Sequence, residues 1–127
     1  IFKHQTSSVN YRIADATRVD KNNRFWAINY FFPGDRETLK PGDDILASKY
    51  GEGLTHSRSE RVERLVEYKI HNKKVLITNN PPIEIKLEGE KTSRKWEAIA
   101  RYENKGFLLA TDKYPKPYTL FAYVPTK

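Results

Sequence analysis

The sequence contains no cysteine and no methionine among its 127 residues. The missing cysteines exclude disulfide bonds and metal sites built on thiolates, although they assign no redox compartment. No apolar run approaches the roughly 20 residues that a membrane span requires, so we expect no membrane partner. The first residues, Ile1-Phe2-Lys3, do not resemble a signal peptide, and the missing initiator methionine indicates a processed product or a domain excised from a longer chain.

The size and charge of the chain favour one domain with a polyanionic partner. A chain of this length can bury a core by itself, and we expect a single domain over residues 1–127. The formal net charge is +7, of which residues 1–63 contribute +1 (ten basic minus nine acidic) and residues 64–127 contribute +6 (thirteen minus seven). Aromatic residues accompany the basic half, a mixture that suits phosphates and flat bases. Solubilising charge over an ordinary aromatic core would give the same composition.

The hydrophobic pattern predicts an α+β domain with a mostly antiparallel sheet. Two strands are expected around the Asp20–Asn23 turn, followed by a loop over residues 33–44 and one short helical turn near residues 45–50. Residues 93–102 fit either a second short helix or a strand. Four further segments are typical of strands, namely residues 73–78, 83–88, 106–112 and 118–124.

One clear central helix is predicted over residues 59–70. Val62, Leu65 and Val66 repeat at i, i+3 and i+4, the spacing of an amphipathic helix. Ser57 and Glu60 have the spacing of a capping box, in which the serine hydroxyl and the glutamate satisfy backbone N–H groups. The sequence therefore places a helix start at this point.

His56, Arg58 and Arg61 lie together at the predicted helix start. Histidine titrates near neutrality and suits proton transfer, and arginines hold phosphates against a helix N-terminus. Cleaving RNA needs a base for the 2′-hydroxyl, an acid for the leaving 5′-oxygen and cations for the phosphorane. His56, Glu60 and the arginines would supply these without a metal or another cofactor. In the plainer interpretation, Glu60 is only a cap, the arginines are solvated, and His56 lies in a loop; we favour the cap for Glu60 and function for the other three.

A C-terminal hairpin is expected from the stretch GFLLATDKYPKPYTLFAYV. Its outward positions include Thr111, Tyr118 and Tyr123, whose hydroxyls would bind phosphate oxygens. The rings of Tyr118 and Tyr123 would stack on bases. The same residues are also simply good strand formers. The cations expected to contact nucleic acid are Lys86, Lys91, Arg94, Lys95, Lys113 and Lys116.

The region from Thr55 to Lys127 resembles ribonuclease toxins. A basic, cysteine-free segment with an early His/Arg/Glu helix and a last hairpin reading LLATDKYP…YTLFAYVP is similar to the C-terminal toxin domains of bacterial contact-dependent and other polymorphic systems, the barnase/EndoU/colicin/RelE-like group. The resemblance implies metal-independent RNA cleavage and delivery within a larger exported protein that acts in a target-cell cytoplasm. It also implies a cognate immunity protein. The catalytic positions to suspect are His56, Arg58, Arg61, Thr111 and Tyr118.

Two other functions remain open from the sequence. Glu84-x-Lys86 has the spacing that metal-dependent nucleases carry on a strand, with Glu60 or Glu63 as a further carboxylate on the preceding helix. An upstream acidic residue is missing, however, because no aspartate lies between Asp44 and Asp112. A strand-rich, basic, aromatic domain can also bind single-stranded nucleic acid without cleaving it, or act as a protein-interaction module.

Overall fold

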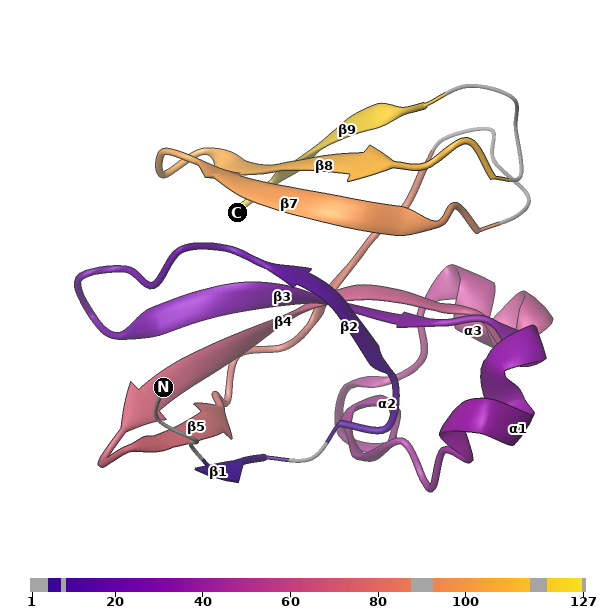
Figure 1. Cartoon of the computed structure of the whole chain (residues 1–127), viewed down its shortest axis with the longest axis horizontal. Coiled ribbons are helices and arrows are strands. Elements are labelled where there is room, and N and C mark those ends of the chain that lie inside the picture. The colour runs from indigo at the N-terminus through magenta and orange to yellow at the C-terminus, as the bar shows by residue number, and fades with distance from the viewer. Residues whose placement is uncertain (1–4, 8, 88–92, 115–118, 127) are drawn as a thin grey trace.

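Two β-sheets packed against each other form the frame of the molecule (Figure 1). The computed structural model describes residues 5–7, 9–87, 93–114 and 119–126. Within these residues the first sheet has the order β1-β5-β4-β3-β2, with β6 paired to β4, and the second has the order β7-β8-β9. The strands are β1 (Gln5–Thr6), β2 (Arg12–Ala16), β3 (Arg24–Phe31), β4 (Val62–His71), β5 (Lys74–Ile77), β6 (Ile83–Glu84), β7 (Trp96–Tyr102), β8 (Gly106–Thr111) and β9 (Phe121–Pro125).

Short helical segments gather at one end of the first sheet (Figure 1). They are a 3₁₀ turn, η1 (Pro33–Asp35), and the helices α1 (Arg36–Leu39), α2 (Ile45–Tyr50) and α3 (Leu54–Ser59). Strands dominate and most strand pairs are antiparallel, with β1 and β5 as the parallel exception among the described pairs. The predicted α+β class is confirmed.

The predicted hairpin near the N-terminus is confirmed. Strands β2 and β3 pair antiparallel, and the Asp20 side chain accepts hydrogen bonds from the backbone N–H groups of Asn22 and Arg24 at 2.8 and 3.0 Å. Asn23 adopts a positive φ of 58°, a conformation that asparagine tolerates better than most residues. Turn chemistry in the sequence was therefore sufficient to locate this connection.

Strands β3 and β4 form the centre of the first sheet, and both of its faces are covered. Successive side chains of a strand point to opposite faces. Trp26, Ile28 and Tyr30 face the second sheet and belong to the larger core cluster. Ala27 lies on the opposite face and packs with Leu46 of α2 in a second cluster. The first sheet is thus buried on one side by the second sheet and partly on the other by α2.

The predicted central helix over residues 59–70 is wrong. Val62–His71 is strand β4, whose residues from Val62 to Lys69 pair with β3, and its first seven residues are all buried. A strand buried on both faces lacks the two-residue alternation, so its apolar residues matched a helical spacing by coincidence. The helix in this region is α3, which ends at Ser59. Glu60 follows it in the left-handed conformation (φ 56°, ψ 23°), so it closes a helix and does not belong to an N-terminal capping box.

The other secondary-structure predictions were confirmed in whole or in part. Of the two interpretations of residues 93–102, the strand is confirmed, as β7. The short helical turn near residues 45–50 is confirmed as α2, and the segments 73–78 and 106–112 contain β5 and β8. In the segment 83–88 only Ile83–Glu84 pairs as a strand.

The second sheet contributes large apolar side chains to the space between the sheets. Trp96 and Phe107 are each 1% exposed, and Trp26 packs against Phe107 with ring centroids 5.4 Å apart. Gly106 allows β8 and β9 to approach closely, since a Cβ there would overlap the carbonyl oxygen of Val124. The space between the two sheets thus holds the larger core cluster.

Candidate functional site

A buried arginine organises the outer face of the first sheet. Arg64 is 2% exposed, and its guanidinium donates two hydrogen bonds of 2.9 Å to the carboxylate of Asp44. Its Nε donates to Oδ1 of Asn29 at 2.9 Å. The Asp44 carboxylate also accepts from the backbone N–H groups of Leu46 and Ala47, as the N-cap of α2. One residue pair thus connects the middle of β4 to the start of a helix.

The same contacts set the ionisation of Asp44. Burial by itself would raise the pKa of this carboxyl. The hydrogen bonds and charge of Arg64, followed by the two backbone N–H groups of α2, outweigh burial and hold the pKa below its ordinary value of 3.8. Asp44 is therefore a fixed negative charge at neutral pH, next to the loop that leads to α3.

His56 lies between two carboxylates. Its Nδ1 is 3.9 Å from Oδ2 of Asp44 and its Nε2 is 3.8 Å from Oε1 of Glu52. The His56 side chain is 16% exposed, and the ring of Tyr11 meets it edge-on with centroids 6.3 Å apart. A histidine whose two ring nitrogens each face a carboxylate is oriented for proton transfer.

A cleft of about 390 Å³ opens beside this histidine. Its wall includes Arg36, whose guanidinium lies 5.6 Å from the ring centroid of Phe31 and forms an ion pair of 2.6 Å with Glu60. Both partners of that ion pair are more than half exposed, so the pair contributes little to stability and can be exchanged for another anion. The lining residues are Tyr11, Phe31, Arg36, Pro41, Gly42, Glu52, His56, Ser57 and Glu60.

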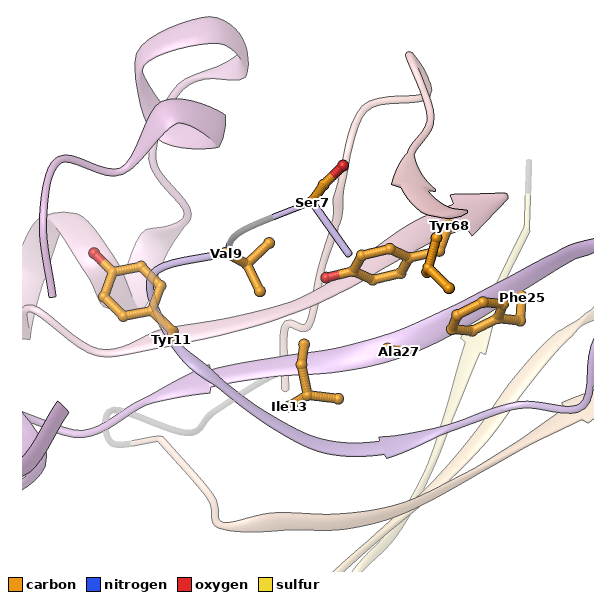
Figure 2. A pocket seen from close by; sticks show the side chains of 8 residues that line it. Ser7, Val9, Tyr11, Ile13, Phe25, Ala27 and Tyr68 are labelled. Carbon is orange, nitrogen blue, oxygen red and sulfur yellow. The ribbon is translucent and has the colours of Figure 1, made fainter. Parts of the chain in front are cut away.

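A second hollow also has Tyr11 in its lining (Figure 2). This groove has a volume of about 420 Å³ and no charged side chain among its lining residues in the described part of the chain. Phe25 and Tyr68 form one wall, with their rings stacked at 5.3 Å and 14°. The remaining lining residues are Ser7, Val9, Tyr11, Ile13, Ala27 and Val75.

The outer face of the second sheet is apolar and exposed. Tyr102 on β7, Leu108 on β8, and Phe121 and Tyr123 on β9 are 43%, 45%, 80% and 50% exposed. The register places Leu108 opposite Tyr123, and the rings of Tyr102 and Tyr123 meet edge-on at 6.3 Å. Lys105 contributes a cation 5.3 Å from the ring of Tyr102. Exposed apolar side chains gathered on one face of a sheet are typical of a contact site.

Glu63 lies on the opposite side of the first sheet from the cleft. It is 4% exposed, and it accepts hydrogen bonds from Nε1 of Trp96 at 2.9 Å and from the backbone N–H of Arg94 at 3.0 Å. Burial raises the pKa of the Glu63 carboxyl despite these donors. Since both donors come from the second sheet and the segment before it, Glu63 connects the two sheets.

The structure separates the predicted catalytic residues. His56 lines the cleft, while Arg58 is exposed outside its lining and Arg61 lies against the ring of Phe32 at 5.4 Å. Thr111 is 4% exposed in the second sheet, where its hydroxyl oxygen accepts from the backbone N–H of Leu120. Tyr118 lies outside the described residues. Among the residues described, the arrangement thus brings His56 together with Arg36, not with Arg58, Arg61 or Thr111.

The residues predicted to contact nucleic acid lie in different environments. Lys86 and Lys113 are exposed, and Lys95 lies between Glu97 and Asp112, with nitrogen–oxygen distances of 3.3 and 3.2 Å. These carboxylates raise the pKa of Lys95. Arg94 is fully buried and its guanidinium donates to Thr111, so it offers no surface to a phosphate. Lys91 and Lys116 lie outside the described residues.

The geometry required by the metal-nuclease alternative is missing from the described residues. The helix expected to carry Glu60 and Glu63 is a strand, with the two residues on either side of its start. The Glu84 carboxylate packs against Gly53, where a Cβ would overlap it, and burial raises its pKa. No group of three or more acidic, histidine or cysteine side chains in the described ranges could hold a metal ion.

Sequence reasoning missed most of the cleft. Arg36, Glu52 and Tyr11 were not predicted as site residues, because they come from three separate segments that only the fold brings to His56. The Asp44-Ile45-Leu46 stretch did carry a signal, since aspartate before an apolar pair is typical of a helix N-cap.

In comparisons with known proteins, no family model, curated protein or solved structure matches this chain. Among the helices that the structure describes, none has the length and apolar character to cross a membrane.

Proposed function

We propose that the protein is a metal-independent ribonuclease acting in the His56 cleft. The observation that carries the proposal is the position of the His56 ring, with Asp44 at Nδ1, Glu52 at Nε2 and an arginine in the wall of the same cleft. A proton donor, a proton acceptor and a cation are the groups that phosphodiester cleavage without a metal requires. The net charge of +7 would favour the approach of RNA.

The roles follow from the chemistry of each group. The Glu52 carboxylate takes the proton of the ribose 2′-hydroxyl as the 2′-oxygen attacks phosphorus. The bond between phosphorus and the 5′-oxygen breaks, and His56 in its protonated form gives its proton to that leaving oxygen. The products are a 2′,3′-cyclic phosphate and a 5′-hydroxyl. Asp44 orients the imidazole through Nδ1, and Arg36 exchanges Glu60 for the phosphate and stabilises its developing charge.

The test uses a DNA oligonucleotide that contains a single ribonucleotide. We expect cleavage only on the 3′ side of that ribonucleotide, equally in EDTA and in Mg²⁺, with a cyclic phosphate end detected by mass spectrometry. The matched all-DNA strand should stay intact because it lacks the attacking 2′-hydroxyl. Intact strands across a panel covering all four ribonucleotides, or cleavage that EDTA abolishes, would overturn the proposal. The resemblance to toxins adds the expectation of a cognate immunity protein, which would have to cover this cleft.

A second candidate function is binding of single-stranded nucleic acid without cleavage. It is favoured by the exposed aromatic face of the second sheet, where Tyr102, Phe121 and Tyr123 offer stacking surfaces on neighbouring strands. Each stacked base is worth about 1–3 kcal/mol, so the Phe121→Ala variant should bind an RNA oligonucleotide about 5-fold to 150-fold more weakly. Fluorescence anisotropy at fixed salt measures the change. Ile45→Ala, which removes a 59% exposed apolar side chain from α2, is the control and should bind like the wild type.

A further inference from the structure

A pocket of about 380 Å³ opens where β3 begins and β4 ends. Arg24 and Lys69 both line this pocket, and the register of the two strands places them directly opposite each other. The helices α1 and α3 adjoin the other ends of the same strands (Figure 1). In the described part of the chain, the pocket shares no lining residue with the His56 cleft, so it is a separate feature of the molecule.

The two cations of this pocket face each other without a full set of partners. Like charges directly opposite each other in a pair of strands cost free energy. Lys69 is exposed and forms no ion pair with any residue that the structure describes. Arg24 forms an ion pair with Glu67, but only at 3.5 Å. An anion between Arg24 and Lys69 would relieve their repulsion, which identifies the charge of the occupant.

Glu67 holds the wall of the pocket in place and leaves Arg24 available. Its side chain is 7% exposed, and its carboxylate accepts hydrogen bonds from the side chains of Thr78 and Asn80 at 2.8 and 2.5 Å. The backbone N–H of Thr78 also donates to the Glu67 carbonyl at 3.0 Å, so the chain after β5 is fixed against β4. Because two closer donors satisfy the buried carboxylate, Arg24 can turn to a ligand without leaving that charge unpaired.

The charge balance around the pocket suits a doubly charged anion. Lys74 is exposed on β5, where its side chain points to the same face as Leu76, the residue paired with Lys69. Arg24, Lys69 and Lys74 therefore outnumber the one carboxylate, Glu67, by two charges. A phosphomonoester carries about −1.5 to −2 charges at neutral pH, and its oxygens fit the forked donors of a guanidinium.

We infer that the pocket binds a small phosphomonoester, whose phosphate lies between Arg24 and Lys69 and whose organic part lies against Leu76. Leu76 lines the pocket and is 39% exposed, so it offers an apolar surface next to the cations. The volume is within the range of small-molecule sites. The inference does not rest on the proposed ribonuclease chemistry, because the two sites have no lining residue in common among those described.

The test uses adenosine 5′-monophosphate, adenosine and inorganic phosphate as probes in a buffer without phosphate at pH 7.5. NMR titrations follow the amide resonances of Leu76 and Thr78 for this pocket and that of Ser57 for the His56 cleft. We expect adenosine 5′-monophosphate to shift the first two resonances at saturable concentrations. Adenosine should bind there at least about 10-fold more weakly, since it lacks the group that accepts charge-assisted hydrogen bonds. Inorganic phosphate should also bind more weakly, because it has no contact with Leu76.

Lys69→Gln separates binding from folding, because its two expected effects have opposite signs. The variant should bind adenosine 5′-monophosphate about 2-fold to 5-fold more weakly, the contribution of one exposed charge pair. Without ligand its thermal unfolding midpoint should rise slightly, since the repulsion from Arg24 is gone. Arg24→Gln should weaken binding at least as much. Lys40→Gln removes the same charge from the C-cap of α1 and, as the matched control, should bind like the wild type.

Each remaining outcome counts against the inference. Equal affinity for adenosine and its monophosphate, or equal affinity in Lys69→Gln and Lys40→Gln, would show that no phosphate lies between the two cations. Inorganic phosphate that binds as tightly as the nucleotide would remove the organic part of the ligand. An all-DNA strand without terminal phosphates that shifts Leu76 and Thr78 at lower concentrations than the nucleotide would assign the pocket to a nucleic-acid backbone instead.

Discussion

The Arg64→Met variant is expected to lose about 3–5 kcal/mol of its free energy of unfolding at pH 7, the cost of breaking a buried ion pair by removing one partner. Methionine replaces much of the apolar stem of the arginine, but it cannot donate to Asp44 or Asn29. The Asp44 carboxylate would then keep its charge in a site where its side chain is only 9% exposed. The loss of the ion pair, more than a loss of packing, causes the destabilisation.

Urea denaturation followed by tryptophan fluorescence measures this loss. Arg12→Met is the matched control, because Arg12 forms an ion pair of 3.0 Å with Asp35 while remaining 44% exposed. Exposed pairs are worth at most about 1 kcal/mol, so the control should unfold nearly as the wild type does. If Arg64→Met were no more destabilised than Arg12→Met, the network around Asp44 would not stabilise the fold.

Two conditions should reduce the effect of Arg64→Met. Adding Asp44→Asn removes the unpaired charge while keeping an N-cap for α2, so the double variant should be more stable than Arg64→Met alone.

Lowering the pH should also reduce the destabilisation caused by Arg64→Met. In the wild type, the lowered pKa of Asp44 contributes stability above its ordinary value of 3.8, and this stability is lost as the pH falls through the lowered pKa. The difference between wild type and variant should therefore shrink as Asp44 becomes protonated.

The sequence predicted those parts of the fold that depend on local chemistry. The Asp20–Asn23 turn fixes its hairpin through backbone hydrogen bonds to one aspartate, and the apolar run of β3 is typical of a buried strand. Strand β4 was mistaken for a helix, since its charged residues looked like the solvated side of one. Glu63 and Arg64 are in fact buried on opposite faces, where Trp96 and Asp44 provide their partners. Those partners are 33 and 20 residues away in the chain, beyond the reach of a local pattern.

The candidate site shows the same division between local and distant information. His56 stood out because the chain has three histidines and this one lies near several arginines. Its actual neighbours come from the residue before β2, from α1 and from the segments before α2 and α3. Arg36 reaches the cleft because η1 and α1 turn the chain back over the end of the sheet, an arrangement that depends on packing and not on spacing. A residue type can thus be suspected from the sequence while its partners cannot.

His56→Ala is expected to reduce RNA cleavage about 100-fold to 10,000-fold, the usual contribution of one acid–base group. The affinity for an all-DNA strand should change little, because this ring is held for proton transfer between Asp44 and Glu52 and not for strand binding. Single-turnover cleavage of the DNA strand with one ribonucleotide gives the rate, and anisotropy gives the affinity. His71→Ala is the matched control, since His71 is exposed at the end of β4 and its loss should leave the rate unchanged.

The pattern of rates distinguishes the proposed roles within the cleft. Asp44→Asn acts through the orientation of the His56 ring, so it should slow cleavage less than His56→Ala, and it should add little to a protein that already carries His56→Ala. Glu60→Gln should instead tighten RNA binding, because it releases Arg36 from its ion pair and removes a negative charge from the cleft. Equal rates for the wild type and His56→Ala would assign the cleavage to another site, and the exposed aromatic face of the second sheet would then account for contact with RNA without providing the chemistry.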